Sequence, residues 1–202
     1  GDIRKMPISE ADKIFAKSPY SATKIAADQI AASYYSSFGL PVTTVRPFNT
    51  YGPRQSNRAI IPTIITQILD GKKQIKLGSL YPTRDFSYID DTVNGFIAAA
   101  ISNKSIGETF NIGAGYEISI GELFEVINKL CGSNSKIKKE NIRVRPKSGE
   151  VCRLKADNRK AKKIINWNPL YTGKSGLIKG LKNTIEWFSE ETNLKKYKTD
   201  HY

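Results

Sequence analysis

The stretch from Ser18 to Phe48 places a helix with clear signals at both ends directly before a run typical of a buried strand. Ser18 is a favoured N-cap residue, Pro19 suits a first helical turn, and Gly39 suits the left-handed position that ends many helices. The run PVTTVRPF then predicts a buried strand that Pro47 ends. A helix joined at once to such a strand is the building unit of α/β folds, so this feature restricts the fold class most.

The rest of the chain continues the alternation of helices and strands. We expect helices in NRAIIPTIITQILDG, in DTVNGFIAAAIS with Asp90 or Asp91 as its cap, in SIGELFEVINKLCG with a capping box from Ser119 to Glu122, in NRKAKKIIN and in GLIKGLKNTIEWFSEE. Strands are expected in QIKLG, RDFSYI, TFNIG, NIRVRP and EVCRLKA, and GAGYEISIGE is interpreted as a strand-to-helix connection. The last helix carries one apolar stripe formed by Leu177, Leu181, Ile185 and Phe188.

The charge balance favours an anionic partner. The chain has 32 basic and 19 acidic residues and a formal net charge of +13, which suits nucleic acid, phosphorylated metabolites or a membrane surface. Much of the excess is lysine in the last third, between apolar residues and without a recognised nucleic-acid motif. We interpret most of it as solvated surface and expect neither nucleic acid nor a membrane as partner.

Metal and histidine chemistry are not expected. Cys131 and Cys152 lack a metal-ligand spacing, and His201 is the only histidine. No run reaches the roughly 18 apolar residues that span a bilayer, and the polar start predicts no signal peptide. We therefore expect a globular, cytoplasmic protein without a metal.

Tyr20 and Lys24 lie four residues apart in the first predicted helix. Positions at this spacing lie one above the other, so a phenol and an ammonium group can face one spot. An ordinary exposed pair has the same spacing. The pair therefore needs support from other segments.

Four further segments give that support. SPYSATKIAAD, which contains the pair, is followed in order by VTTVRPFNTYGPRQ, RDFSYIDD, ETFNIG and the stretch from RPKSGEV to INWNP. Together they resemble the extended short-chain dehydrogenase/reductase family of NAD-dependent nucleotide-sugar epimerases and dehydratases, over nearly the whole chain. The spacing of RPKSGEV, longer than the commoner RPGEV-like form, is most similar to hexosamine 4,6-dehydratases.

The resemblance implies NAD as cofactor and a nucleotide-diphosphate sugar as substrate. It implies that Tyr20 exchanges a proton with a sugar hydroxyl while hydride passes from the same carbon to the nicotinamide, whose ribose Lys24 holds. A free tyrosine titrates near pH ~10, and an exposed helical neighbour contributes only about 0.5 kcal/mol. Such a pair therefore needs a dry cleft and the positive charge of oxidised nicotinamide.

RPFNTYGPR follows the predicted strand, so its polar residues are expected at the carboxyl edge of the sheet, where α/β proteins usually bind ligands. By resemblance, Pro47 and Phe48 flank the nicotinamide, and Asn49 reaches the substrate near its diphosphate. A strand end turning through prolines would explain Pro47 and Pro53, but not the polar residues Arg46, Asn49 and Arg54 gathered around them.

Arg84 and Arg145 match the positions at which family members bind the diphosphate. Guanidinium groups suit this role because they bind such oxygens in bidentate fashion. Arg58 is a further candidate, although a lone surface arginine would look the same. Asn111 and Trp167 also match the family pattern, and we assign both mainly to packing and turn geometry.

The domain organisation follows from the resemblance. The family's dinucleotide-binding half begins with a glycine-rich turn and an acidic residue, and neither occurs in these 202 residues. We therefore expect a fragment with a partial Rossmann-like parallel sheet and a small α+β substrate-binding domain. Residues 1–55 are interpreted as the last part of the NAD-binding domain, residues 56–192 mainly as the nucleotide-sugar-binding domain with some returning Rossmann elements, and residues 193–202 as a frayed polar tail.

The expected activity is that of a UDP- or GDP-hexosamine 4,6-dehydratase. A nucleotide-sugar 4-epimerase is the alternative, because the residues that separate the two are expected before Gly1. A different class is an inactive fragment or a basic binding module. Family members dimerise through the helix bearing the tyrosine and lysine, so a homodimer is expected, with Ala27, Ile30, Ala31 and Tyr34 on the outer face.

Overall fold

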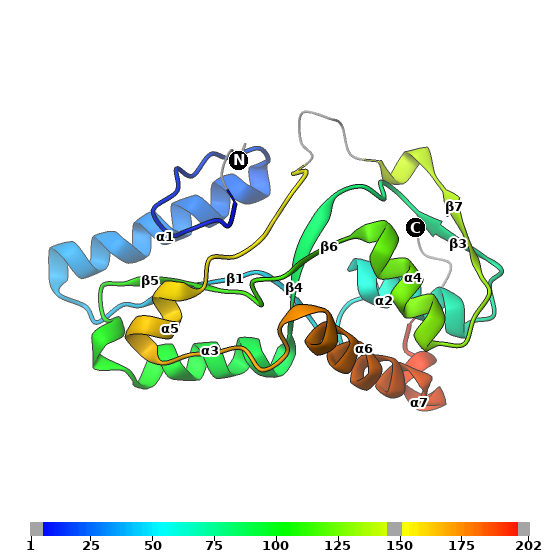
Figure 1. The fold of residues 1–202 in the computed structure, drawn as a ribbon. Helices are drawn as coiled ribbons and strands as arrows, with labels where there is room; N and C mark the ends of the chain where they lie inside the picture. The colour runs from blue at the N-terminus through cyan, green and yellow to red at the C-terminus, as the bar shows by residue number, and fades with distance from the viewer. Residues whose placement is uncertain (1–5, 145–150, 198–202) are drawn as a thin grey trace.

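The computed structural model describes residues 6–144 and 151–197 (Figure 1). Its helices are α1 (Pro19–Phe38), α2 (Ile60–Leu69), α3 (Ile89–Ile101), α4 (Ile120–Leu130), α5 (Arg159–Ile165), α6 (Gly173–Ser189) and α7 (Glu191–Leu194). Two 3-10 turns are η1 (Asn103–Ser105) and η2 (Asn141–Arg143). The strands are β1 (Thr44–Pro47), β2 (Asn49–Tyr51), β3 (Gln74–Leu77), β4 (Thr83–Tyr88), β5 (Thr109–Ile112), β6 (Glu117–Ser119) and β7 (Lys136–Lys139).

Strands β1 and β5 form a parallel pair between two helical layers. Thr44 lies opposite Thr109, and the register continues to Pro47 opposite Ile112. Helix α1 covers one side of the pair, and α3 and α5 lie on the other (Figure 1). The buried side chains lie on the side of α3 and α5: Ala99, Phe110, Ile112, Ala161, Ile165 and Trp167. This layered arrangement confirms the α/β fold class.

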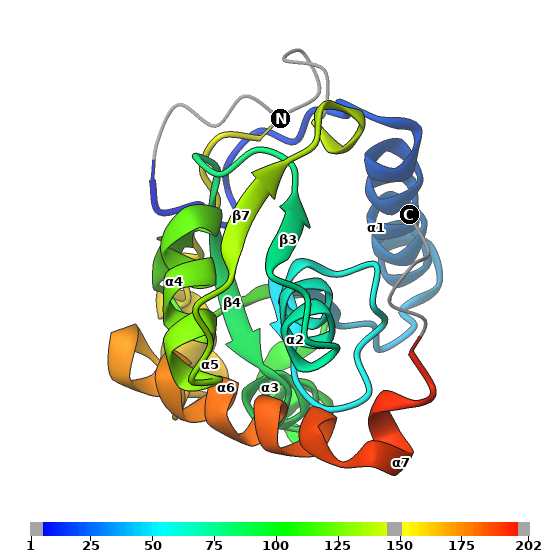
Figure 2. The same cartoon turned by 90° about the vertical axis from the view of Figure 1, so that its right-hand side faces the viewer.

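The second, larger core surrounds the remaining strands. β4 pairs in parallel with β2 and antiparallel with β6, while β3 and β7 form a separate parallel pair. Helices α2, α4 and α6 pack around these strands (Figure 2). The chain passes from the first sheet to the second at Phe48, between β1 and β2. That crossing places the carboxyl end of β1 beside the second core. The expected domain division stays a prediction.

The predicted ends of α1, the predicted start of α4 and the stripe on α6 are confirmed. Ser18 caps α1 through a capping box with Ser21, and Gly39 ends the helix with φ +66°. Ser119 and Glu122 form the expected capping box of α4. The four predicted stripe residues of α6 are all buried: Leu177, Leu181, Ile185 and Phe188. Local signals sufficed because caps involve neighbouring residues only.

The predicted cap of α3 is wrong. The helix begins at Ile89, its N-cap is Tyr88, and both aspartates lie in the first turn. Asp91 instead accepts hydrogen bonds of 2.8 Å from the backbone N–H groups of Leu170 and Tyr171. Its carboxylate therefore ties α3 to the segment that precedes α6.

Several expectations for strands need correction. The run before Pro47 is only half-buried, because β1 has one strand partner among the described residues. Residues 141–143 form a 3-10 turn rather than a strand, and residues 151–157 contain a single bridge, between Ala156 and Ile8. Strands β2, β6 and β7 were not expected. All three are short, and β7 is a lysine-rich edge strand in which every residue but Ile137 is exposed.

Within the stretch expected to fray, the described residues 193–197 pack against the core. Helix α7 begins at Glu191, and the Asn193 side chain donates a 3.0 Å hydrogen bond to the carbonyl oxygen of Trp187. The Tyr197 ring packs against Phe188, with 4.9 Å between ring centroids. An aromatic anchor beyond the helix therefore holds this stretch against the core.

Candidate functional site

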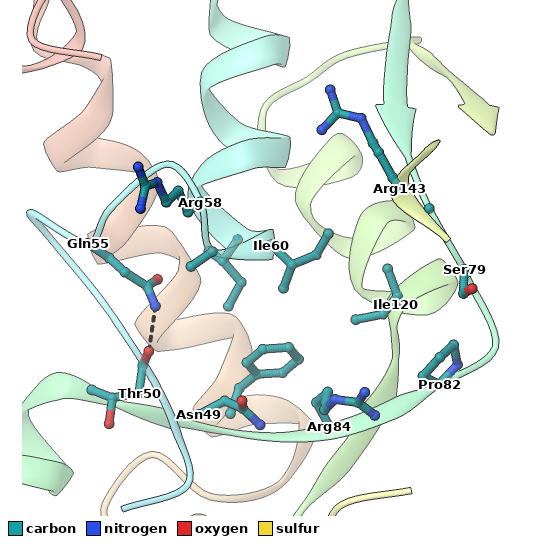
Figure 3. Close-up of a pocket in the computed structure, with 14 residues that line it drawn as sticks. Asn49, Thr50, Gln55, Arg58, Ile60, Ser79, Pro82, Arg84, Ile120 and Arg143 are labelled. Carbon is teal, nitrogen blue, oxygen red and sulfur yellow. Dashed lines mark hydrogen bonds between the residues drawn. The ribbon is translucent and has the colours of Figure 1, made fainter. Parts of the chain in front are cut away.

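Two adjacent pockets share Asn49 and Thr50, the first residues of β2. We call the first the arginine pocket; it has a volume of about 520 Å³ and is lined by Arg58, Arg84 and Arg143 (Figure 3). We call the second the tyrosine pocket; it has a volume of about 540 Å³ and contains Tyr20 in its wall. The start of β2 therefore forms the boundary between the two.

The arginine pocket combines cationic groups with an apolar wall. Arg84 donates from Nη1 to the carbonyl oxygens of Thr83, at 2.8 Å, and Val151, at 2.6 Å. Arg143 pairs through Nε with Glu140 at 2.8 Å. Ile60 and Ile120 lie between the arginines (Figure 3). Such a pocket suits an anion attached to a flat or apolar group.

The tyrosine pocket lies where α1 begins and β1 ends. Pro47 and Phe48 come from the end of β1, while Ile8 and Leu154 come from two segments that a parallel bridge between Ile8 and Ala156 joins. The Tyr20 side chain opens to solvent, with 71% of its surface exposed. The pocket therefore offers an aromatic and apolar wall next to an accessible phenol.

Lys24 lies on the same face of α1 as Tyr20. Its Nζ atom lies 5.5 Å from the centroid of the Tyr20 ring. Arg46 anchors this helix to β1 through a 2.7 Å contact between its Nε and the Asp28 carboxylate. Since Arg46 is engaged in this way, it serves to hold α1 against the sheet.

Asn111 and Trp167 have the packing roles that we expected. Asn111 is buried, and its Nδ2 donates to the carbonyl oxygen of Ile8 at 3.1 Å. Its backbone N–H donates to Glu10 at 2.7 Å, so Asn111 fixes the segment in front of α1. Trp167 is also buried, and its indole N–H donates to the carbonyl oxygen of Asp91.

The predicted site residues fall into two groups. Tyr20, Pro47 and Phe48 line the tyrosine pocket, Arg58 and Arg84 line the arginine pocket, and Asn49 lines both. Lys24 is placed beside the Tyr20 ring but does not line the pocket. Arg145 lies outside the described residues. The structure thus brings the predicted residues to one region, and their chemical roles stay predictions.

Arg143 and Gln55 also line the arginine pocket, although neither was predicted as a site residue. Arg143 lies in η2, which follows β7, and reaches the pocket because β7 pairs with β3. The Gln55 amide donates to the carbonyl oxygen of Thr50 at 2.6 Å. The GPRQ motif was the available signal for Gln55, whereas the position of Arg143 depends on strand pairing.

Asp85 is a fully buried carboxylate beside the arginine pocket. Burial raises its pKa to about 6 from an ordinary value of 3.8, although backbone N–H groups of Ala156, Ala114 and Gly115 oppose the rise. Within residues 6–144 and 151–197, no cluster of acidic, histidine or cysteine side chains could hold a metal ion.

The sequence model of the family described as GDP-mannose 4,6 dehydratase matches residues 1–179. The chain belongs to this family. Membership confirms the resemblance drawn from the motifs, because the relatives of this dehydratase family are NAD-dependent nucleotide-sugar enzymes of the extended short-chain dehydrogenase/reductase type.

Individual family members differ in activity. The chain is 35% identical over 181 residues to a UDP-glucuronate 4-epimerase of Thermodesulfobacterium geofontis, covering 89% of this chain and 53% of the relative. It is 38% identical over 164 residues to a UDP-N-acetyl-alpha-D-glucosaminuronate decarboxylase of Bacillus cytotoxicus, covering 79% and 50%. The chain thus spans about half the length of these curated relatives.

A solved structure shares the fold of this family member. The dTDP-glucose 4,6-dehydratase DesIV of Streptomyces venezuelae, crystallised with NAD bound, aligns with a TM-score of 0.85 and 26% identity. The alignment covers 98% of this chain and 58% of the dehydratase. Among the described residues of the present chain, no helix has both the length and the apolar character needed to span a bilayer.

Proposed function

We propose that the chain is the substrate-binding part of an NAD-dependent nucleotide-sugar 4,6-dehydratase acting on a UDP- or GDP-hexosamine. The observation that supports this most is the contact between the two pockets at Asn49 and Thr50. A substrate lying across that boundary would reach the arginines and Tyr20 at the same time. A diphosphate linked to a sugar has this combination of an anionic and a neutral part.

The arginine pocket would bind the diphosphate. Arg58, Arg84 and Arg143 line it together, and a diphosphate carries the opposite charge. Arg145 stays a candidate for the same role. The apolar residues between the arginines, including Ile60 and Ile120, would contact the flat base of the nucleotide.

The tyrosine pocket would hold the reacting sugar carbon. Pro47 and Phe48 line this pocket and would flank the nicotinamide ring, and Lys24 lies one helical turn from Tyr20. NAD, when bound, supplies a hydride acceptor. Tyr20 would remove the proton of the C4 hydroxyl, and Lys24 would hold the nicotinamide ribose next to the phenol. In the dehydratase reaction, water then leaves across C5 and C6, and the hydride returns to C6.

A nucleotide-sugar 4-epimerase is the second candidate. The relative that is 35% identical over 181 residues is named a UDP-glucuronate 4-epimerase. Its activity needs the same oxidation at C4, so Tyr20, Lys24 and the arginines would keep their roles. The two candidates differ only after oxidation, when the epimerase returns the hydride to the opposite face of C4.

A homodimer formed through α1 belongs to the same proposal. No side chain of this 20-residue helix is buried, and Ile30, Tyr34 and Phe38 are exposed at a spacing of four residues. A helix that presents such an apolar stripe to solvent is suited to pairing with its own copy about a twofold axis.

The product mass tests the proposed activity. The full-length protein that contains this chain should be incubated with NAD and each candidate UDP and GDP sugar. Loss of one water supports the dehydratase, and an unchanged mass with inverted C4 supports the epimerase. Failure to form any product or any NADH, together with no binding of UDP or GDP, would contradict both.

A further inference from the structure

Asp85 connects three parts of the chain through one buried carboxylate. Its Oδ1 accepts a 2.9 Å hydrogen bond from the backbone N–H of Ala114, and its Oδ2 accepts bonds of 2.9 Å from those of Gly115 and Ala156. Ala114 and Gly115 follow β5, whereas Ala156 lies far away in the sequence. A carboxylate that meets three N–H donors is suited to fixing backbone segments.

Residues 151–156, which we call the strap, run beside β4 towards α5 (Figure 1). The N–H of Thr83 donates to the carbonyl oxygen of Cys152 at 2.9 Å. Arg84 donates to the carbonyl oxygen of Val151 at 2.6 Å, and the N–H of Ala156 donates to Asp85. Three successive residues of β4 therefore hold the strap at three points.

The strap also contacts the tyrosine pocket. Leu154 lines that pocket, and the carbonyl oxygen of the next residue, Lys155, accepts a 2.8 Å hydrogen bond from the N–H of Ile8, which lines it as well. At the other end, the strap meets Arg84 in the arginine pocket. Its position thus affects the walls of both pockets.

We propose that Asp85 is a positioning residue, which seats the strap on β4 and thereby sets the direction of the Arg84 guanidinium in the arginine pocket. This inference rests on the proposed function, in which Arg84 binds the substrate diphosphate. Asp85 touches neither pocket and acts through the strap. Without its carboxylate, the N–H groups of Gly115 and Ala156 lose their acceptor in a buried region, so the strap shifts and takes Val151 with it.

A double-mutant cycle in the 202-residue chain, with UDP as the probe, separates this role from plain stabilisation. We expect Asp85→Asn and Arg84→Ala each to weaken UDP binding about tenfold. In Asp85→Asn, the N–H donors of the side-chain amide would face the backbone N–H groups. If Asp85 acts through Arg84, the double variant binds UDP no more weakly than Arg84→Ala. A residue that only stabilises the fold leaves the affinity of the folded protein unchanged.

Arg153→Ala loosens the strap from its surface side and preserves the core. Arg153 belongs to the strap and pairs through Nε with Glu117 of β6 at 3.1 Å, and its side chain is 58% exposed. We expect UDP binding to weaken about threefold in wild type and not at all when Arg84 is already alanine. If Asp85→Asn does not fold, this variant carries the test.

Arg159→Ala is the matched control. Arg159 also pairs with a carboxylate, that of Asp157, and its side chain is 85% exposed, but it lies beyond the strap. UDP affinity should stay unchanged. The positioning role alone is overturned if Arg84→Ala weakens UDP binding as expected but Asp85→Asn and Arg153→Ala do not. It is also overturned if their losses of affinity add to that of Arg84→Ala. Unchanged affinity in Arg84→Ala overturns the proposed diphosphate role of Arg84, and the inference with it.

Discussion

The ammonium group of Lys24 lies over the ring of Tyr20, with 5.5 Å between Nζ and the ring centroid. A capped helix start holds the pair, since Ser18 accepts a hydrogen bond from the N–H of Ser21. The phenol is exposed, while its neighbours Pro47 and Phe48 close the wall behind it. Under the proposed function, the pair would meet the cofactor and the sugar at one place.

Replacing Tyr20 by phenylalanine should abolish sugar oxidation in the full-length protein. Only the hydroxyl is lost, so binding of the nucleotide sugar should change by less than about twofold. Single-turnover absorbance of NADH measures oxidation, and calorimetry measures binding. Tyr34→Phe is the control, because Tyr34 is exposed on the same helix away from both pockets. NADH formation at the normal rate in Tyr20→Phe would rule out the proton role.

Arg143 and Arg58 should both contribute to the affinity for UDP. Each of Arg143→Ala and Arg58→Ala is expected to weaken binding to the 202-residue chain roughly tenfold, as for the loss of a hydrogen bond to a charged group. Lys139→Ala removes the same charge from the neighbouring strand, lines neither pocket, and should leave affinity nearly unchanged. Equal losses in all three variants would mean that general charge attraction accounts for the effect.

The fold could be predicted from the sequence where the signals are local. Ser18, Gly39 and the Ser119 capping box marked helix ends because caps depend on residues close in sequence. The strand β7 has only one inward apolar residue, Ile137, and pairs with β3 far away in the sequence. Nothing local identifies such a strand, and the same holds for the packing of Tyr197 beyond α7.

For the candidate site too, local motifs located some residues, whereas tertiary contacts placed the others. Motifs located Tyr20, Asn49 and Arg84, and the structure places all three around the two adjoining pockets. Arg143 could not be located, because its direction depends on a 3-10 turn after a missed strand. Asp85 lies next to Arg84 in a quoted motif, but its role depends on N–H donors about 30 and 70 residues away. Burial of this kind is a tertiary property.

The exposed stripe of α1 should control dimerisation of the full-length protein. Ile30→Asp places a charge in the middle of this stripe, and we expect light scattering to show monomers where the wild type shows dimers. Ile101→Asp is the matched control, because Ile101 is an exposed isoleucine near the end of α3. Monomers in the wild type, or in both variants, would exclude α1 as the specific interface.

Asp85 should make the protein less stable as pH rises from about 4 to about 6. Its pKa is raised to about 6 in the folded protein, so the unfolded chain loses this proton at lower pH than the folded chain. The folded state then binds more protons in that window, and the free energy of unfolding falls by up to about 3 kcal/mol. Urea unfolding of wild type and Asp85→Asn at several pH values measures this. The difference in free energy of unfolding between the two proteins should vary with pH in that window. A constant difference would contradict the raised pKa of Asp85.

Gly180→Ala should destabilise the protein although alanine favours helices. A Cβ atom at this position of α6 would lie 2.2 Å from Oη of Tyr51, which is buried and donates a hydrogen bond to the carbonyl oxygen of Leu177. Overpacking of this kind costs about 1–3 kcal/mol, more than the gain of up to about 1 kcal/mol from helix propensity.

Gly121→Ala is the control for Gly180→Ala, because Gly121 is also helical and a Cβ there would have its nearest neighbour at 3.7 Å. The control should be as stable as wild type or slightly more stable, whereas Gly180→Ala should unfold at clearly lower urea concentration. The contrast isolates the contact between α6 and Tyr51, because both variants add the same methyl group to a helix. Equal midpoints for the two variants would show that α6 does not pack this closely on the strand that carries Tyr51.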